Sequence, residues 1–296
     1  MSLQAPLAHI AHSFPTSRLP AVNVAQVPQR SPLRYPGGKT WLIPHVRDWL
    51  RQVQPTLLVE PFCGGGIVSL TAVMEGLVEQ CVMLDLDPDV AAFWHAVLRE
   101  GEALAQRIET FEPTRERVEA LSQKVPLSVL DHGFRTLVLN RTRRSGILAP
   151  GAALIRQGEN GQGLGSRWYP DTLARRIRAI QPYASRIAFA QGDALALLPP
   201  LLHGWGRRAA LFVDPPYTAG GKRAGQRLYA HHELDHEQLF ALLACGRGSF
   251  LLTYDAAPAI EHLVLRYGFH PVRVAMKNAH HARLPELVIT PEPLFT

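Results

Sequence analysis

The sequence predicts a doubly wound α/β fold with a mostly parallel sheet and an inserted smaller, mainly helical domain. Three observations support this prediction. Short apolar runs alternate with helical patterns, four of these runs end in carboxylates, and the excess positive charge lies in one segment. With 296 residues, 47% of them hydrophobic and 19% charged, the chain is long enough for a sizeable core and too apolar to be disordered.

Four apolar runs have the length and the flanks of buried strands. They span residues 57–60, 81–85, 209–214 and 249–255. Helical patterns follow them: one over residues 67–76, one that begins at Pro88, and one that Asp235 caps with Gln238 three residues later. Strands that alternate with helices indicate a parallel sheet, and ligands of such sheets bind beyond the carboxyl ends of the strands.

The pattern divides the chain into four predicted segments. Residues 1–30 contain four prolines and few charges, which is typical of an N-terminal tail. Residues 31–98 and 189–296 form the two parts of the α/β core. Residues 99–188 combine Arg-rich helical stretches with a glycine-rich loop, and we interpret them as the inserted domain.

The net charge of +6 comes from this insert. Residues 99–188 hold 15 of the 31 Lys and Arg residues but only 9 of the 25 Asp and Glu residues. A local excess of arginine indicates a polyanion partner, usually nucleic acid. The alternative is a solvated face that is rich in arginine.

Composition also excludes several classes of protein. No apolar stretch approaches the roughly 20 residues that a membrane span needs, and no secretory signal precedes the first strand. Cys63, Cys81 and Cys245 lack the spacing of a zinc site. We therefore expect a cytoplasmic protein without a membrane or metal partner, and we interpret the pairs His231-His232 and His280-His281 as loop residues.

A glycine-rich turn follows the first predicted strand. Glu60 ends the strand, and Phe62 precedes a cysteine and three consecutive glycines, which let a ligand approach the backbone. Asp85, at the end of the next strand, suits hydrogen bonding to ribose hydroxyls. The turn fits S-adenosylmethionine. A dinucleotide cofactor fits less well, because Ser69 occupies the third glycine position, and a turn without a ligand is the other alternative.

Asp214-Pro215-Pro216-Tyr217 follows the third apolar run and is the most informative motif of the chain. The exocyclic amine of adenine is a poor nucleophile because its lone pair is delocalised into the ring. A carboxylate next to a rigidly held backbone carbonyl can accept both amine hydrogens and so activate the nitrogen. An aromatic ring beside them can stack on a base that has left the duplex.

These motifs, in this order, resemble the Dam-type DNA adenine-N6 methyltransferases (D12 class, α group) over about residues 31–296. Residues 32–39 (PLRYPGGK) resemble the N-terminal motif of the family, residues 60–66 the cofactor loop, and residues 214–217 the catalytic motif. The resemblance implies a Rossmann-like, S-adenosylmethionine-dependent methyltransferase core. It also implies cofactor contacts from Tyr35, Lys39, Glu60, Phe62, Gly64, Gly66, Asp85, Asp193 and Asp214.

The resemblance further implies an activity. A site-specific, adenine-specific DNA methyltransferase transfers the methyl group of S-adenosylmethionine directly to N6 of a flipped adenine, without a metal. Asp214 and the Pro215 carbonyl would accept the amine hydrogens, Pro216 would keep the turn rigid, and Tyr217 would stack on the base. The partner would be double-stranded DNA, and the enzyme would be either an orphan or paired with a restriction endonuclease, in a bacterium or encoded by a phage.

The insert contains the stretch that would contact DNA. Residues 140–149 (NRTRRSGILA) align with the recognition stretch of the family, which implies DNA contacts from Asn140, Arg141, Arg143, Arg144 and Ser145. Ser145 and Ala149 occupy positions where readers of GATC carry Asn and Arg, so we do not predict GATC specificity. Arg143 and Arg144 either read bases or hold phosphates.

Two other functions stay open at this stage. The first is a catalytically silent DNA-binding regulator on the same fold, which would need neither Lys39 nor the motif at residues 214–217. The second is a methyltransferase that acts on RNA or protein.

Overall fold

The computed structural model of the chain describes residues 22–35, 37–149, 151–158, 161–216, 234–274 and 286–294. Tyr217 and both histidine pairs lie outside these ranges. Within them, no helix is both long and apolar enough to cross a membrane. The described residues also contain no group of three or more His, Cys, Asp or Glu side chains that could hold a metal ion.

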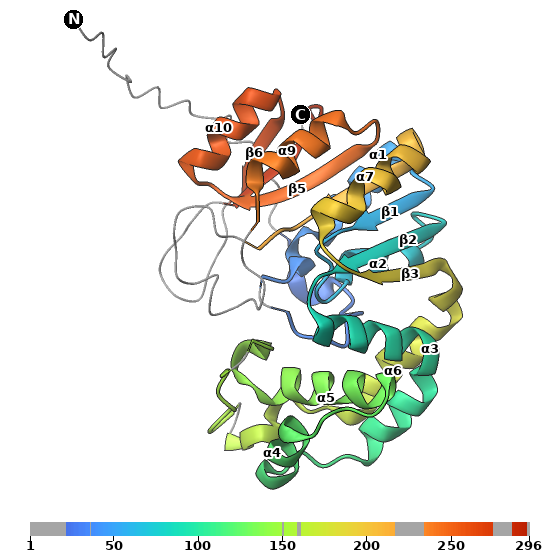
Figure 1. The fold of residues 1–296 in the computed structure, drawn as a ribbon, viewed down its shortest axis with the longest axis vertical. Coiled ribbons are helices and arrows are strands. Elements are labelled where there is room, and N and C mark those ends of the chain that lie inside the picture. Colours follow the sequence, from blue (N-terminus) through green and yellow to red (C-terminus); the bar gives the residue numbers. More distant parts are fainter. Residues whose placement is uncertain are drawn as a thin grey trace, which may run out of the picture.

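Seven described strands form one sheet in the order β3-β2-β1-β4-β5-β7-β6 (Figure 1). The five strands β3, β2, β1, β4 and β5 run parallel to one another, whereas β7 runs antiparallel to both β5 and β6. The predicted doubly wound, mostly parallel sheet is therefore confirmed. The strands are β1 (Leu57–Glu60), β2 (Gln80–Asp85), β3 (Ile187–Gln191), β4 (Ala209–Val213), β5 (Ser249–Asp255), β6 (His270–Val274) and β7 (Glu286–Thr290).

Helices cover both faces of this sheet because the strands are apolar on both sides. In β4 the side chains of Ala210 and Phe212 belong to one buried cluster, and those of Leu211 and Val213 belong to another on the opposite face. The first cluster contains α1 (Ile43–Val53), α2 (Ile67–Met74) and α3 (Pro88–Thr110). The second contains α7 (Ala194–Trp205), α9 (His236–Cys245) and α10 (Pro258–Tyr267).

A group of helices extends away from the sheet below β3 (Figure 1). It consists of the second half of α3 together with α4 (Arg115–Gln123), α5 (Val129–Thr142) and α6 (Pro170–Ile180). The long helix α3 connects it to the core and departs from helical geometry at Glu100, with φ −133° and ψ 33°. This group carries most of the Arg-rich segment predicted from the charge.

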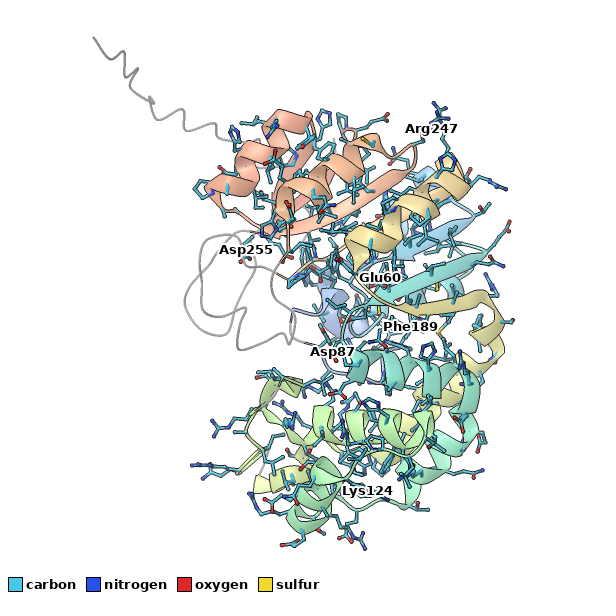
Figure 2. The ribbon with its side chains drawn as sticks, viewed as in Figure 1. Glu60, Asp87, Lys124, Phe189, Arg247 and Asp255 are labelled. Carbon is cyan, nitrogen blue, oxygen red and sulfur yellow. The ribbon has the colours of Figure 1, made fainter. Side chains whose placement is uncertain are left out.

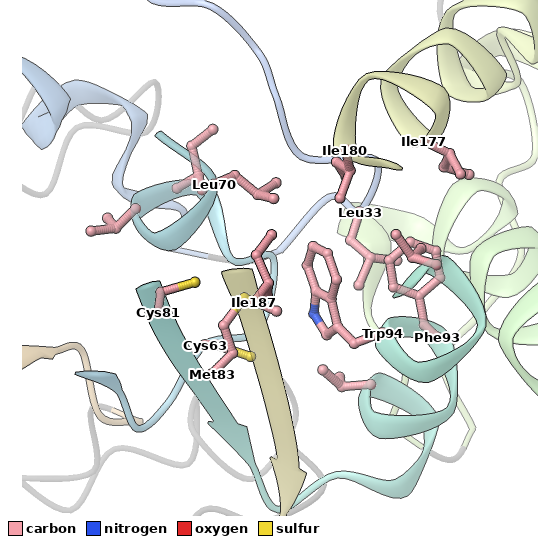
Figure 3. Packing of buried hydrophobic residues seen from close by; sticks show 14 of the residues in the cluster. Leu33, Cys63, Leu70, Cys81, Met83, Phe93, Trp94, Ile177, Ile180 and Ile187 are labelled. Carbon is pink, nitrogen blue, oxygen red and sulfur yellow. The ribbon is translucent and has the colours of Figure 1, made fainter. Parts of the chain in front are cut away.

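One hydrophobic cluster is continuous from the sheet into these helices. Figure 3 shows Trp94 of α3 between Ile187 of β3 and Ile180 of α6, with Leu33 close by. Because the core does not stop at residue 98, the division into a methyltransferase core and an insert at residues 99–188 stays a prediction. The N-terminal segment is also anchored, since Val27 is buried and Arg30 pairs with Glu75 at 2.9 Å.

The carboxyl ends of the parallel strands lie at one edge of the sheet. Figure 2 places Glu60 at the end of β1, Asp87 just beyond β2 and Asp255 at the end of β5 on this side, and Arg247, which precedes β5, on the other. β1 lies between β2 and β4, so the chain reverses its winding direction at β1. Ligands of such sheets bind at this switch point.

Candidate active site

A cavity of about 640 Å³ opens at the switch point of the sheet. Its volume lies within the range of roughly 300–1,000 Å³ that is usual for small-molecule sites. Residues from the ends of β1, β2 and β4, from the segment after β3, and from the N-terminal segment line it. The predicted residues that it brings together are Tyr35, Lys39, Glu60, Phe62, Gly66, Asp85, Arg141, Ser145, Asp193, Asp214 and Pro216.

The glycine turn after β1 is shaped by close contacts. Gly64 (φ +44°) and Gly66 (φ +61°) have left-handed backbones, and a Cβ on Gly64 would lie 2.6 Å from the ring of Tyr35. The Gly64 N–H donates to Oδ2 of Asp85 at 2.9 Å, and its carbonyl accepts from the Trp94 indole at 2.9 Å. The turn is therefore fixed between Tyr35 and the end of β2, which fits a nucleoside-bearing ligand on its open side.

Asp85 is buried where it ends β2. In addition to the Gly64 amide, it accepts a hydrogen bond from the Asp87 N–H at 3.0 Å. Burial raises the pKa of Asp85 to about 6, although these backbone hydrogen bonds act in the opposite direction. The carboxylate is thus held in one orientation at the cavity surface, as hydrogen bonding to a ribose requires.

Glu60 is even more enclosed, with 3% of its surface exposed. Its Oε2 accepts from the Ser69 N–H at 2.9 Å, in the first turn of α2. Burial raises the pKa of Glu60 to about 8. At neutral pH this carboxyl is therefore largely protonated, and it fastens α2 to β1 while it lines the cavity.

Lys39 forms the centre of a buried charge network. Its Nζ lies 2.9 Å from Oδ1 of Asp214 and 3.2 Å from Oε1 of Glu286, and it donates to the Gly37 carbonyl at 2.8 Å. Burial acts to lower the pKa of Lys39, but the two carboxylates outweigh it and raise the pKa. Oδ1 of Asp214 also accepts from the Thr253 hydroxyl at 2.7 Å. The network fixes the carboxylate of Asp214 one residue beyond β4.

Sequence reasoning missed two members of this network, Glu286 and Thr253. Glu286 begins β7, and the signal that could have indicated it is a lone carboxylate before the apolar run Leu287–Thr290. Thr253 is a polar residue in the otherwise apolar middle of β5. The antiparallel pairing of β5 with β7 brings both close to Lys39.

The other predicted cofactor residues have varied positions. Tyr35 and Phe62 line the cavity. Asp193 also lines it, and its Oδ1 accepts from the Leu195 N–H at 2.9 Å, which caps α7. Gly64 shapes the turn, but the cavity surface is formed by Gly65 and Gly66. Among the motif residues at 214–217, Asp214 and Pro216 face the cavity, and Pro215 is buried between them.

The predicted DNA-contacting residues fall into two groups. Asn140 is buried and holds the backbone of Arg34, with Oδ1 accepting at 2.8 Å and Nδ2 donating at 2.7 Å. Arg143 is half-buried and donates to the Leu148 carbonyl at 2.9 Å. Arg144 and Ser145 are exposed and line a second hollow of about 600 Å³.

The cavity carries two opposite sets of charged groups. The acidic cluster comes from the strand ends and comprises Glu60, Asp85, Asp87, Asp193 and Asp214. The arginine cluster comes from the N-terminal segment, α5, the 3₁₀ turn at Gly163–Arg167 and α6, and comprises Arg34, Arg141, Arg167 and Arg176. A cationic nucleoside ligand fits the acidic cluster, and an anion fits the arginine cluster.

Comparisons with known proteins agree with this geometry. The sheet and the cavity at its switch point have the architecture of a Rossmann-like α/β fold, and a family match indicates methyltransferase chemistry. The sequence model of the D12 class N6 adenine-specific DNA methyltransferase family matches residues 35–124, which confirms the resemblance over that part of the chain. No curated protein matches the chain.

The chain also shows a low similarity to solved structures. The rRNA methyltransferase aviRa from Streptomyces viridochromogenes is 17% identical, with a TM-score of 0.35, and the match covers 94% of this chain and 87% of that one. An rRNA methylase from Streptococcus thermophilus is 12% identical, with a TM-score of 0.33 and coverage of 84% and 94%. Similarity at this level carries no information about activity or substrate.

Proposed function

We propose that this methyltransferase transfers the methyl group of S-adenosylmethionine to the N6 amine of an adenine in double-stranded DNA, after the base leaves the helix. The observation that carries the proposal is the placement of Asp214. Its carboxylate faces the cavity directly after β4 and is fixed by Lys39 and Thr253. The family match over residues 35–124 supports the choice of adenine in DNA.

The residues of the cavity fit this cofactor. A Cβ on Gly64 or Gly66 would collide with Tyr35 or Trp94, so the turn needs glycine at both positions to keep its shape beside the cavity. Asp85 is oriented for the ribose hydroxyls, and Tyr35 and Phe62 offer aromatic surface. When bound, the cofactor supplies an electrophilic methyl group on a sulfonium sulfur.

The side chains would then act on the amine of the base. Asp214 and the Pro215 carbonyl would accept its two hydrogens, so that the nitrogen lone pair becomes available as the N–C bond forms and the S–C bond breaks. One amine proton leaves through Asp214 to solvent. Lys39 holds the carboxylate in place, and Tyr217, outside the described residues, would stack on the base.

Mapping modified bases in a methylation-free bacterial host tests this function. The gene is expressed there, and the genome is sequenced at the single-molecule level, beside an Asp214→Ala control. We expect N6-methyladenine in one short recognition sequence with the native protein and none with the variant. Unmodified DNA together with methylated rRNA would show that the substrate is RNA and not DNA. The absence of any methylated product would favour a DNA-binding regulator.

A further inference from the structure

The arginine cluster contains a buried charge that the protein does not balance. Arg141 is 5% exposed and lines the cavity, yet its Nε is buried without a hydrogen-bond partner in the described part of the chain. Burial of a guanidinium to this extent is costly unless its charge is offset. Because Arg141 lines the cavity, an anion bound there would supply that offset.

The groups around Arg141 are cationic too. Burial lowers the pKa of Arg141, and the charges of Arg176, Arg34 and Arg167 lower it further. Because a guanidinium stays protonated in proteins, the four positive charges repel one another in the native structure. An anion between them would offset both the repulsion and the desolvation of Arg141.

Two of the guanidinium groups are also held in place before any ligand arrives. Arg141 Nη2 donates to the Pro32 carbonyl, and Arg176 Nη1 donates to the Ser31 carbonyl at 3.0 Å. Asn140 fixes the backbone of Arg34 from both sides. The segment at residues 31–34 thus connects α5 and α6, and the arrangement is preorganised, which reduces the entropy lost on binding.

We propose that the arginine cluster is an oxyanion subsite that binds one phosphodiester of the DNA strand whose base reaches Asp214. This inference rests on the proposed function, because the DNA strand that the subsite would bind is the substrate of that function. Arginine forks match the oxygens of a phosphate in a bidentate manner. The subsite and Asp214 line the same cavity, so the phosphate belongs to a nucleotide near the reacting base.

The surface next to the subsite favours a strand over a small anion. Arg167 and Ser145 line both the cavity and the second hollow, which Arg144 and Arg156 also line. Positive charge therefore continues outward from the cavity, as the path of a phosphate backbone requires. The carboxylate of the cofactor is the other oxyanion that could occupy the subsite, and the tests below distinguish the two.

Inorganic phosphate probes the subsite without DNA. We expect phosphate to raise the thermal unfolding midpoint of the native protein by about 2–5 °C over chloride at equal ionic strength. Arg141→Gln and Arg176→Gln should abolish this rise. Arg175→Gln is the matched control, because Arg175 is exposed on α6 and lies outside the cavity lining. A native protein without a phosphate response, or variants that keep it, would overturn the subsite.

Binding of a short duplex tests the occupant. Arg176→Gln should weaken binding about tenfold and lower the log-log salt slope by about 1, whereas Arg175→Gln should lower affinity less. An unchanged slope would contradict the phosphodiester. Arg176→Gln should also bind S-adenosylhomocysteine and 5′-methylthioadenosine, which lacks the carboxylate, as the native protein does. Selective loss of S-adenosylhomocysteine would assign the subsite to the cofactor carboxylate and overturn the proposal.

These outcomes separate the subsite from the proposed function. DNA methylation in the host without any phosphate response would leave the function in place and remove the subsite. A phosphate response and a changed salt slope without methylated bases would support the subsite and reject methyl transfer to DNA.

Discussion

The acidic cluster and the arginine cluster line one cavity but differ in how their charges are satisfied. In the acidic cluster, Asp85 accepts from backbone N–H groups, and Asp214 is paired with Lys39. In the arginine cluster, Arg141 lies near other cations, and among the described residues its buried Nε has no hydrogen-bond partner. The carboxylates of Asp85 and Asp214 are thus satisfied by groups of the protein, whereas Arg141 is buried among like charges. Substitutions in the two clusters should therefore have different effects on activity, stability and binding.

Asp214→Ala should have the largest effect. The variant removes the acceptor for an amine hydrogen, and we expect the single-turnover rate of methyl transfer to fall about 10²–10⁴-fold. Lys39 keeps Glu286 as a partner, so the fold should survive. Affinities for duplex DNA and for S-adenosylhomocysteine should change only a few-fold. Asp48→Ala, on the exposed face of α1, is the control, and a rate near the native value in Asp214→Ala would refute the mechanism.

Lys39→Met should have the next largest effect. The variant leaves the buried Glu286 and the partly exposed Asp214 without their shared cation, and breaking a buried pair of this kind costs about 3 kcal/mol. Glu286→Gln should cost less, because Lys39 keeps its pair with Asp214. Urea unfolding of both variants measures the difference. Equal stabilities would show that the network does not hold the acidic cluster together.

Asn140→Ala tests the support of the arginine cluster. The variant leaves the buried backbone groups of Arg34 and the carbonyl of Gly146 without their partner, which should cost about 2–4 kcal/mol of unfolding free energy. If Asn140 instead contacts DNA, as its motif implies, the unfolding free energy should stay unchanged and the affinity for duplex DNA should fall. Measuring both quantities on the same variant decides between the two roles.

Local patterns predict part of this molecule well. The runs that give β1 and β5 are found at their true bounds, and Asp235 caps α9 by accepting from the Gln238 N–H, because apolar length and capping are local properties. By contrast, β3, β6 and β7 were not predicted. β3 and β6 lie at the two edges of the sheet and are mostly half-buried or exposed, so their apolar patterns are weak, and β7 is defined by antiparallel pairing with β5.

The residues of the site can also be divided into those that local patterns predict and those that they do not. The residues of the acidic cluster follow predicted strands, so the sequence indicates most of them. Glu286 meets Lys39 from almost the opposite end of the chain, and no spacing rule relates the two. The charge excess of residues 99–188 is visible in the sequence. That Arg34 and Arg176 line the same cavity depends on how residues 31–34 pack against α5 and α6.

Glu60→Gln should have the smallest effect, and it should depend on pH. The pKa of Glu60 is about 8 in the folded protein and near 4.5 in the unfolded chain, so the folded state binds the extra proton between these values. Its contribution to stability is fully present below about pH 4.5 and is lost as pH rises through 8. Glutamine keeps the acceptor for Ser69 and does not titrate. The variant should therefore gain about 2 kcal/mol relative to the native protein between about pH 6 and pH 8.

Urea unfolding of the two proteins across this range measures the gain. Asp85, with a pKa of about 6, titrates in both proteins and largely cancels in the difference. Parallel stability curves would mean that Glu60 is ionised in the folded state. The acidic cluster would then hold a further negative charge, at Glu60, in addition to Asp85 and Asp214, and the contrast with the arginine cluster would lose its basis.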